Sequence, residues 1–175
     1  MVTHPSILLI EDSLGECELF RLALIQTAFD VVLYTQHDAD AALHFLNDRV
    51  HHSKWPLQPR SSTSPEGAHS DRVPSASTGD RSGLPSLILL DLKLGRRNGC
   101  DFLIRLRADT RFSAIPVVVF TTSDDQTDLA NCYANGANGY VVKPGTYDKL
   151  VHCTGDICRY WLRWNRSLLT AETRC

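Results

Sequence analysis

The sequence of 175 residues predicts an α/β fold, in which five parallel strands form one sheet with helices on both faces. Two observations lead to this prediction. Short apolar runs alternate along the chain with amphipathic stretches of helical spacing, which is the element order of a parallel sheet. The apolar runs also lack the in-out alternation of half-exposed strands, as expected for strands that are buried on both faces.

The first part of the chain predicts two strands and two helices. Residues 6–10 (SILLI) indicate a buried strand, and residues 30–35 (DVVLYT) indicate a second one. Ser13 is suited to cap the helix after the first strand, with Glu16 at the position of a capping box. A second helix is expected over residues 38–48, where apolar side chains fall on one face.

The later part of the chain predicts three more strands, each followed by a helix. The strands are expected at residues 87–90, 115–120 and 139–142, and the helices at 100–109, 125–134 and 146–169. Gly136 is suited to end the helix before the fifth strand, because glycine readily adopts the left-handed conformation of a helix C-terminus.

Residues 51–84 differ in composition from the rest of the chain. Half of them are Ser, Thr, Pro or Gly. Such a segment cannot bury enough apolar surface to offset the entropy lost on ordering. We therefore expect a flexible insertion at 51–84 in a single domain that spans residues 5–169, with a C-terminal tail at 170–175.

Composition excludes several classes of protein. A net charge of −2 argues against a general nucleic-acid binder. The sequence has no apolar run long enough to span a membrane and no secretory signal. The six cysteines form no CxxC pair, which favours free thiols in a reducing compartment. We therefore expect a cytoplasmic protein that binds neither DNA nor a membrane.

Polar side chains follow four of the five predicted strands. Glu11 and Asp12 end the first strand, Asp91 the third, Thr121 the fourth and Lys143 the fifth. The carboxyl ends of parallel strands share one edge of the sheet, so these residues are expected to converge. Grouped carboxylates need a cation, and oxygen ligands suit Mg²⁺. A carboxylate beside such an ion can accept a phosphoryl group, whose charge the lysine would stabilise.

Four motifs in this order resemble the receiver domains of two-component response regulators. They are LLIED (8–12), LILLD (87–91), VVVFTTS (117–123) and GYVVKP (139–144). The resemblance covers about residues 5–160, apart from the insertion. It implies a flavodoxin-like, doubly wound sheet of five strands in the order 2-1-3-4-5, with five helices.

The resemblance also implies a phosphoacceptor and a metal site. Asp91 matches the aspartate that accepts a phosphoryl group from a sensor histidine kinase. Asp12, Asp91 and the backbone carbonyl of Lys93 match the protein ligands of a Mg²⁺ cofactor, and Glu11 matches a residue that acts on the metal through water. No other cofactor is expected.

Further roles follow from the same resemblance. Thr121 and Lys143 match the residues that contact the phosphoryl group. Thr121 and Tyr140 match the pair that switches conformation after phosphorylation. The bond between Lys143 and Pro144 matches one that is cis in the family, and Gly99 stands where the family has a glycine.

The loop after Asp91 departs from the family pattern. Gly95 replaces a proline that often stands four residues after the phosphoacceptor, and Lys93, Arg96 and Arg97 make the loop basic. We hypothesise that the Lys93 ammonium lies near phosphorylated Asp91 and changes how readily water attacks it.

The predicted last helix carries an apolar and aromatic stripe. Its members are Leu150, Ile157, Trp161, Trp164 and Leu168. Docking on the sheet explains the early part, but a helix over residues 146–169 would be about 36 Å long, more than this sheet needs. We therefore hypothesise a homodimer through Trp161, Trp164 and Leu168. This region resembles single-domain regulators that serve phytochrome-type histidine kinases.

The resemblance thus implies a single-domain response regulator that signals through protein–protein contacts. It would not be an enzyme beyond its own phosphotransfer and autodephosphorylation. Two alternatives stay open. One is a phosphohydrolase with an aspartate nucleophile, although such enzymes usually have a second aspartate where this chain has Lys93. The other is a receiver-like module that binds a partner without being phosphorylated.

Overall fold

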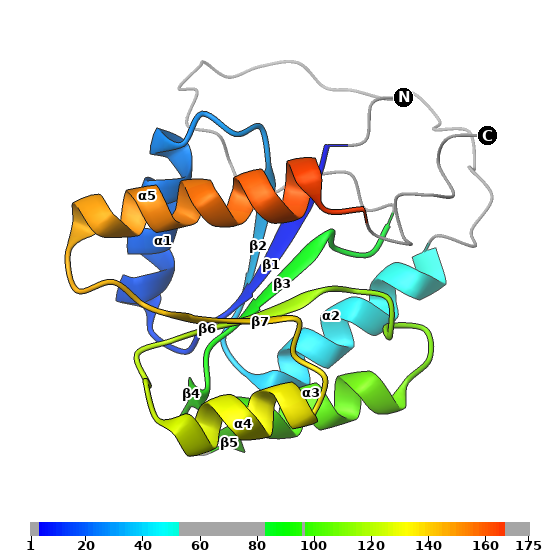
Figure 1. Ribbon diagram of the computed structural model, residues 1–175. Coiled ribbons are helices and arrows are strands. Elements are labelled where there is room, and N and C mark those ends of the chain that lie inside the picture. The colour runs from blue at the N-terminus through cyan, green and yellow to red at the C-terminus, as the bar shows by residue number, and fades with distance from the viewer. Residues whose placement is uncertain (1–3, 53–82, 96, 167–175) are drawn as a thin grey trace, which may run out of the picture.

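The computed structural model describes residues 4–52, 83–95 and 97–166 (Figure 1). The strands of its main sheet are β1 (Ser6–Ile10), β2 (Val32–Gln36), β3 (Leu87–Leu90), β6 (Val117–Thr121) and β7 (Gly139–Val142). All neighbouring pairs are parallel, in the order β2-β1-β3-β6-β7. Numbered along the chain within this sheet, the order is 2-1-3-4-5, and the predicted fold class is confirmed.

Helices cover both faces of the sheet. They are α1 (Leu14–Gln26), α2 (Ala39–His52), α3 (Gly99–Ala108), α4 (Gln126–Ala134) and α5 (Tyr147–Cys158), and the π-helix η1 (Arg159–Trp164) continues α5. In Figure 1, α1 and α5 lie on one face, and α2, α3 and α4 lie on the other. A small antiparallel pair, β4 (Lys93–Leu94) and β5 (Arg97–Asn98), follows β3. Within the described ranges, no helix is long and apolar enough to cross a membrane.

The central strands are apolar throughout because each of their faces meets a separate core. In β1, Ile7 and Leu9 pack toward α1 and α5, whereas Leu8 and Ile10 pack toward α2 and α3. The side chains of β3 divide in the same way, and all four of them are fully buried. This two-sided burial fixes the register of the central strands and hence the level at which each strand ends.

Local signals in the sequence set several helix ends. Ser13 caps α1, and its side chain accepts a hydrogen bond from the Glu16 amide. Asp125 caps α4 by accepting from the amides of Thr127 and Asp128. Gly136 follows α4 with φ +90°, which is the left-handed conformation expected of it.

Three expectations need correction. Helix α2 continues to His52, so the start of the insertion predicted at 51–84 is helical, while residues 53–82 lie outside the described residues. The last helix does not reach residue 169: η1 ends at Trp164, because the backbone of Asn165 turns to an extended conformation (ψ 138°) after its amide makes the last bond of the π-helix, to the Tyr160 carbonyl. The bond before Pro144 is trans, the ordinary state of a peptide bond.

Candidate functional site

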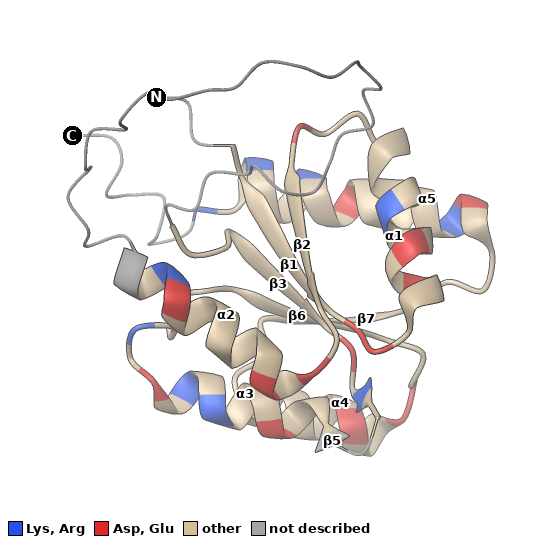
Figure 2. Ribbon diagram, turned by 180° about the vertical axis from the view of Figure 1, so that it is seen from behind, with Lys and Arg blue, Asp and Glu red and all other residues tan. Residues whose placement is uncertain are grey.

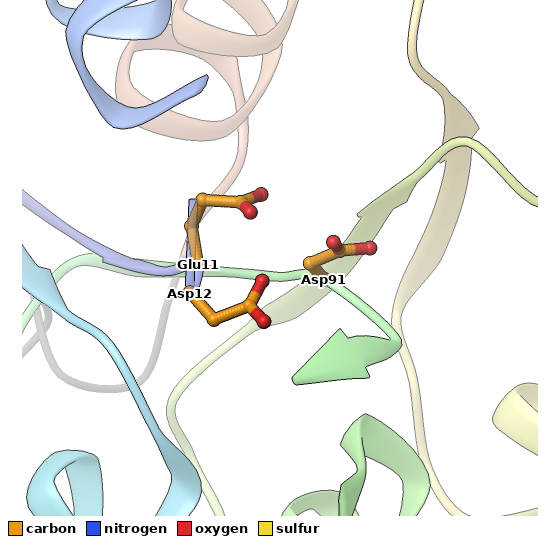
Figure 3. A group of neighbouring side chains, drawn as sticks. All are labelled: Glu11, Asp12 and Asp91. Carbon is orange, nitrogen blue, oxygen red and sulfur yellow. The ribbon is translucent and has the colours of Figure 1, made fainter. Parts of the chain in front are cut away.

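Three carboxylates meet at the carboxyl edge of the sheet. Glu11 and Asp12 directly follow β1, and Asp91 follows the neighbouring β3, so the three side chains lie side by side, with those of Glu11 and Asp12 extending toward Asp91 (Figure 3). Each offers an oxygen that lies within 4.8 Å of the oxygens of the others. Glu11 and Asp91 are buried, at 2% and 5% exposure, whereas Asp12 is exposed. The predicted convergence is therefore present, with one side open to solvent.

Backbone hydrogen bonds hold these carboxylates level with one another. The pairing of Ile10 with Leu90 brings the ends of β1 and β3 together, and the Asp91 amide donates to the Ile10 carbonyl at 3.0 Å. The Leu92 amide donates to Asp91 Oδ1 at 2.7 Å, which fixes the rotation of that carboxylate. The Gly95 amide donates to Asp12 Oδ2 at 2.9 Å. The loop after β3 thus orients two of the three carboxylates.

Gly99 allows this loop to fold back against Asp91. Its amide donates to the Leu92 carbonyl at 2.9 Å. A Cβ atom at position 99 would lie 2.3 Å from the Asp91 carbonyl oxygen and 2.9 Å from the Leu92 Cα. Both of these are backbone atoms, so the site needs a residue without a side chain here.

Lys143 places one ammonium group among these carboxylates. Its Nζ donates to Glu11 Oε2 at 2.5 Å and to the Glu16 carboxylate, and it lies 3.4 Å from Asp91 Oδ2. The Lys143 amide donates to the Thr121 carbonyl, which anchors the lysine at the end of β7. Burial by itself would lower the pKa of Lys143, but the hydrogen bonds to Glu11 and Glu16 and the charge of Asp91 outweigh it and raise that pKa.

One ammonium does not balance the charge of the site. Glu11, Glu16 and Asp91 contact Lys143, Asp12 lies beside Glu11 and Asp91, and further acidic residues occupy the loops at this edge of the sheet (Figure 2). Burial raises the pKa of Glu11, and the pairing with Lys143 offsets that effect only in part. A compact set of carboxylate oxygens with excess negative charge is the donor set of a hard divalent cation.

Thr121 and Tyr140 contact the same residue in the loop after β6. The buried Thr121 Oγ1 accepts a hydrogen bond from the Ser123 amide at 3.3 Å. The Tyr140 hydroxyl donates to the Ser123 carbonyl at 3.0 Å, and burial raises the pKa of this tyrosine. Ser123 Oγ in turn donates to Asp128 on α4 at 2.6 Å. Ser123 therefore links the end of β6, the aromatic of β7 and helix α4.

Lys93 joins two of the loops that border the site. Its exposed side chain donates from Nζ to Thr122 Oγ1 at 3.1 Å. Lys93 lies two residues after Asp91, and Thr122 directly follows Thr121. The hydrogen bond therefore ties the loop after β3 to the loop after β6.

The three residues predicted at a dimer interface differ in their surroundings. Trp161 is partly buried and packs toward Gly139 and the core beneath α5. Trp164 is 68% exposed at the end of η1. Leu168 lies outside the described residues. Docking on the sheet thus accounts for Trp161 but not for Trp164.

The sequence reasoning assigned Glu16 only to the capping of α1. In the structure its carboxylate also binds Lys143. A usable signal was present, because the first turn of a helix that follows β1 starts at the same edge of the sheet. An acidic side chain there is placed to reach the site.

Comparison with known proteins gives a consistent result. The model of the response regulator receiver domain family matches residues 73–154. The chain is 35% identical over 161 residues to the probable methanogenesis regulatory protein FilR2 of Methanothrix harundinacea, and the match covers 92% of this chain and 86% of that protein.

Two crystal structures extend the comparison. The phosphorylated cyanobacterial phytochrome response regulator RcpA matches with a TM-score of 0.70 at 25% identity, covering 94% of this chain and 99% of that one. The Mn²⁺-bound form of Rcp1, a response regulator of Synechocystis, matches with a TM-score of 0.68 at 27% identity, covering 93% and 98%.

Proposed function

The chain belongs to the family of response regulator receiver domains, and from this membership we propose that a sensor histidine kinase phosphorylates it on Asp91. The observation that carries the proposal is the position of Asp91, which is buried at the sheet edge, 3.4 Å from the Lys143 ammonium and beside two further carboxylates. A carboxylate oxygen of Asp91 would attack the phosphorus atom, and the bond from phosphorus to the histidine nitrogen of the kinase would break.

The acidic cluster fits a Mg²⁺ cofactor. Asp12, Asp91 and the backbone carbonyl of Lys93 would bind the ion directly, and Glu11 would hold a water ligand. When bound, Mg²⁺ would neutralise charge on the carboxylates and on the transferred phosphoryl group. The Mn²⁺-bound form of Rcp1 supports a divalent cation in a related protein.

Lys143 would stabilise the phosphorylated state directly. Its ammonium is now shared among Glu11, Glu16 and Asp91. A phosphoryl group on Asp91 would bring oxygens with greater charge within reach of the same Nζ atom. The lysine would then bind the product of the transfer more strongly than it binds the free carboxylate, which favours the reaction.

The switch would run through Ser123. If the Thr121 hydroxyl turns to donate to a phosphoryl oxygen, it releases the Ser123 amide that it now binds. Ser123 also accepts a hydrogen bond from the Tyr140 hydroxyl and donates one to Asp128 on α4. A local change at Asp91 would thereby shift α4 and Tyr140 between two states, and partner proteins would recognise the altered surface.

Phosphorylation by acetyl phosphate tests the proposal. On a phosphate-affinity gel we expect a retarded band that requires Mg²⁺, does not form in EDTA and is lost in Asp91→Asn. Asp101→Asn, which changes an exposed aspartate of α3, is the matched control and should label like the parent. Equal labelling of Asp91→Asn would overturn the assignment. No labelling of the parent with Mg²⁺ would instead favour a phosphorylation-independent module.

We further propose that the kinase is of the phytochrome type and that the protein acts in the cytoplasm as a regulator without enzymatic activity beyond phosphotransfer and autodephosphorylation. The likeness to RcpA supports the type of kinase. Radiolabel transfer to Asp91 from a purified phytochrome-type kinase, faster than from an unrelated histidine kinase, is the expected result. Steady release of phosphate from a phosphate ester by the parent protein would support the phosphohydrolase alternative instead.

We also propose a homodimer through the end of the last helix. Trp164 and Tyr160 are 68% and 57% exposed on η1, which leaves two large aromatics for a partner copy. Sedimentation at tens of micromolar should show a dimer for the parent and a monomer for Trp164→Ala. Substitution of Trp161 is less informative, because that side chain also packs against the core. A monomeric parent would contradict the proposal.

A further inference from the structure

Two cysteines from different helices lie in contact on the α3–α4 side of the sheet. Cys100 is in the first turn of α3, and Cys132 is near the end of α4. Their Sγ atoms are 3.5 Å apart, although the residues are separated by 32 positions in the chain. Cys132 is fully buried, whereas Cys100 is partly exposed to solvent. Both are free thiols in this structure.

The pair lies beside the elements that the proposed switch uses. Tyr140 and Cys100 pack against the apolar cluster that contains Cys132. Helix α4 bears both Cys132 and Asp128, the partner of Ser123. A bond that restrains Cys132 would therefore also restrain α4, the helix that Ser123 contacts in the proposed switch.

We propose that Cys100 and Cys132 are a redox-sensitive pair, which a peroxide converts to a disulfide that joins α3 to α4. A disulfide needs a sulfur–sulfur distance of about 2.05 Å, so the two atoms must approach by about 1.5 Å. Rotation of the two side chains, with a small shift between the helices, supplies an approach of this size. The reverse step needs only a thiol reductant.

The chemistry assigns different roles to the two sulfurs. The sulfur of Cys100, the partly exposed residue of the pair, attacks one oxygen of hydrogen peroxide; the O–O bond breaks, the second oxygen leaves as water, and Cys100 becomes a sulfenic acid. The Cys132 sulfur then attacks the Cys100 sulfur, the S–O bond breaks, and a second water leaves. Two thiols are oxidised by two electrons in total, and one peroxide is reduced to two waters.

Burial explains why Cys132 is the second sulfur to react. It raises the pKa of Cys132 to about 12, so little thiolate is present to attack a peroxide. Once Cys100 is a sulfenic acid at contact distance, the neighbouring Cys132 is the sulfur that can reach it. The same closeness protects Cys100 from further oxidation.

A disulfide would restrain α4 relative to α3. This consequence rests on the proposed function, because it matters only if α4 moves when Asp91 is phosphorylated. The oxidised protein would still accept a phosphoryl group, since neither cysteine contacts the acidic cluster. The change at α4 that follows phosphorylation would be reduced.

Mass spectrometry of the full chain tests the pair without reference to phosphorylation. After hydrogen peroxide, and then an alkylating agent in denaturant so that buried thiols also react, we expect one linked peptide pair that contains Cys100 and Cys132 and has lost two hydrogen atoms. Of the six thiols, two should become unreactive, and dithiothreitol should restore them. Cys100→Ser and Cys132→Ala should abolish the linked pair. Cys153→Ser, at another partly exposed cysteine, should retain it.

Full alkylation of both residues after peroxide, or a sulfinic acid at Cys100 without a linked peptide, would overturn the proposal. If Cys132→Ala proves unstable by circular dichroism, Cys100→Ser, which changes a partly exposed residue, carries the test alone. A second experiment measures hydrogen exchange of the α4 amides with and without acetyl phosphate. Acetyl phosphate should change this exchange less in the oxidised protein than in the reduced protein. If the disulfide forms but the protein is not phosphorylated, the redox pair is established and the proposed function is refuted.

Discussion

Replacing Lys143 with methionine should destabilise the protein by removing the single ammonium within the acidic cluster. The pair with Glu11 is buried on both sides, with side-chain exposures of 9% and 2%. Removing one partner of a buried ion pair typically costs about 3–5 kcal/mol. The contact with the 42% exposed Glu16 adds at most about 1 kcal/mol because solvent screens it. We therefore expect a loss of about 3–5 kcal/mol in the free energy of unfolding.

Mg²⁺ and pH should distinguish this cause from simple loss of packing. Without the ammonium, the cluster should bind Mg²⁺ more tightly, and each tenfold gain in affinity adds about 1.4 kcal/mol to the stabilisation by the ion. The raised pKa of Lys143 keeps its contribution complete at neutral pH and lost only in strong base. At low pH the deficit of the variant should shrink as carboxylates protonate, among them Glu11, whose pKa burial raises above its ordinary value.

The assay is urea unfolding followed by circular dichroism, in EDTA and in Mg²⁺, at neutral and acidic pH. Lys149→Met, at an exposed lysine of α5, is the matched control and should change stability by no more than about 0.5 kcal/mol. If Lys143→Met behaves like this control, the ammonium does not stabilise the cluster. Equal stabilisation of the parent and the variant by Mg²⁺ would show that the ammonium and the ion do not share one site.

Three further predictions follow from single contacts. Gly99→Ala should cost about 1–3 kcal/mol and reduce acetyl phosphate labelling, because its Cβ would displace the Asp91 backbone, whereas Gly145→Ala, in open space, should do neither. Tyr140→Phe should lose about 0.5–1.5 kcal/mol in urea unfolding, with labelling retained; lost labelling would contradict a role in the switch alone. Lys93→Ala should speed autodephosphorylation severalfold, since the bond to Thr122 no longer closes the front of the site; equal rates of decay on the phosphate-affinity gel would exclude this.

The fold and the convergence of the site residues could be predicted because both depend on strand ends. Continuous apolar runs located β1, β3 and β6, and the residue after each run was necessarily at the shared edge of the sheet. The bounds of the elements were less accurate: β6 begins two residues later than expected. Pro116 explains this shift, because proline has no amide hydrogen to donate to the ladder.

Features that depend on contacts between distant residues could not be predicted. The end of η1 at Trp164 comes where the backbone of Asn165 becomes extended, and no residue pattern predicted this change. The contact of Cys100 with Cys132 depends on how α3 packs beside α4, and spacing along the chain contains no information about it. The hydrogen bond from Lys93 to Thr122 depends on the direction of the lysine side chain, which the sequence does not specify.

The charge of the site explains why a cation and phosphorylation should depend on each other. Among the described residues, four carboxylates and the Lys143 ammonium make up this site, an excess of three negative charges at full ionisation. The proposed phosphorylation of Asp91 would replace a single negative charge by about two and enlarge that excess. A divalent cation reduces it by two in either state, and its attraction to the phosphorylated state is the greater. By linkage, an ion that binds the phosphorylated form more tightly must favour phosphorylation to the same degree.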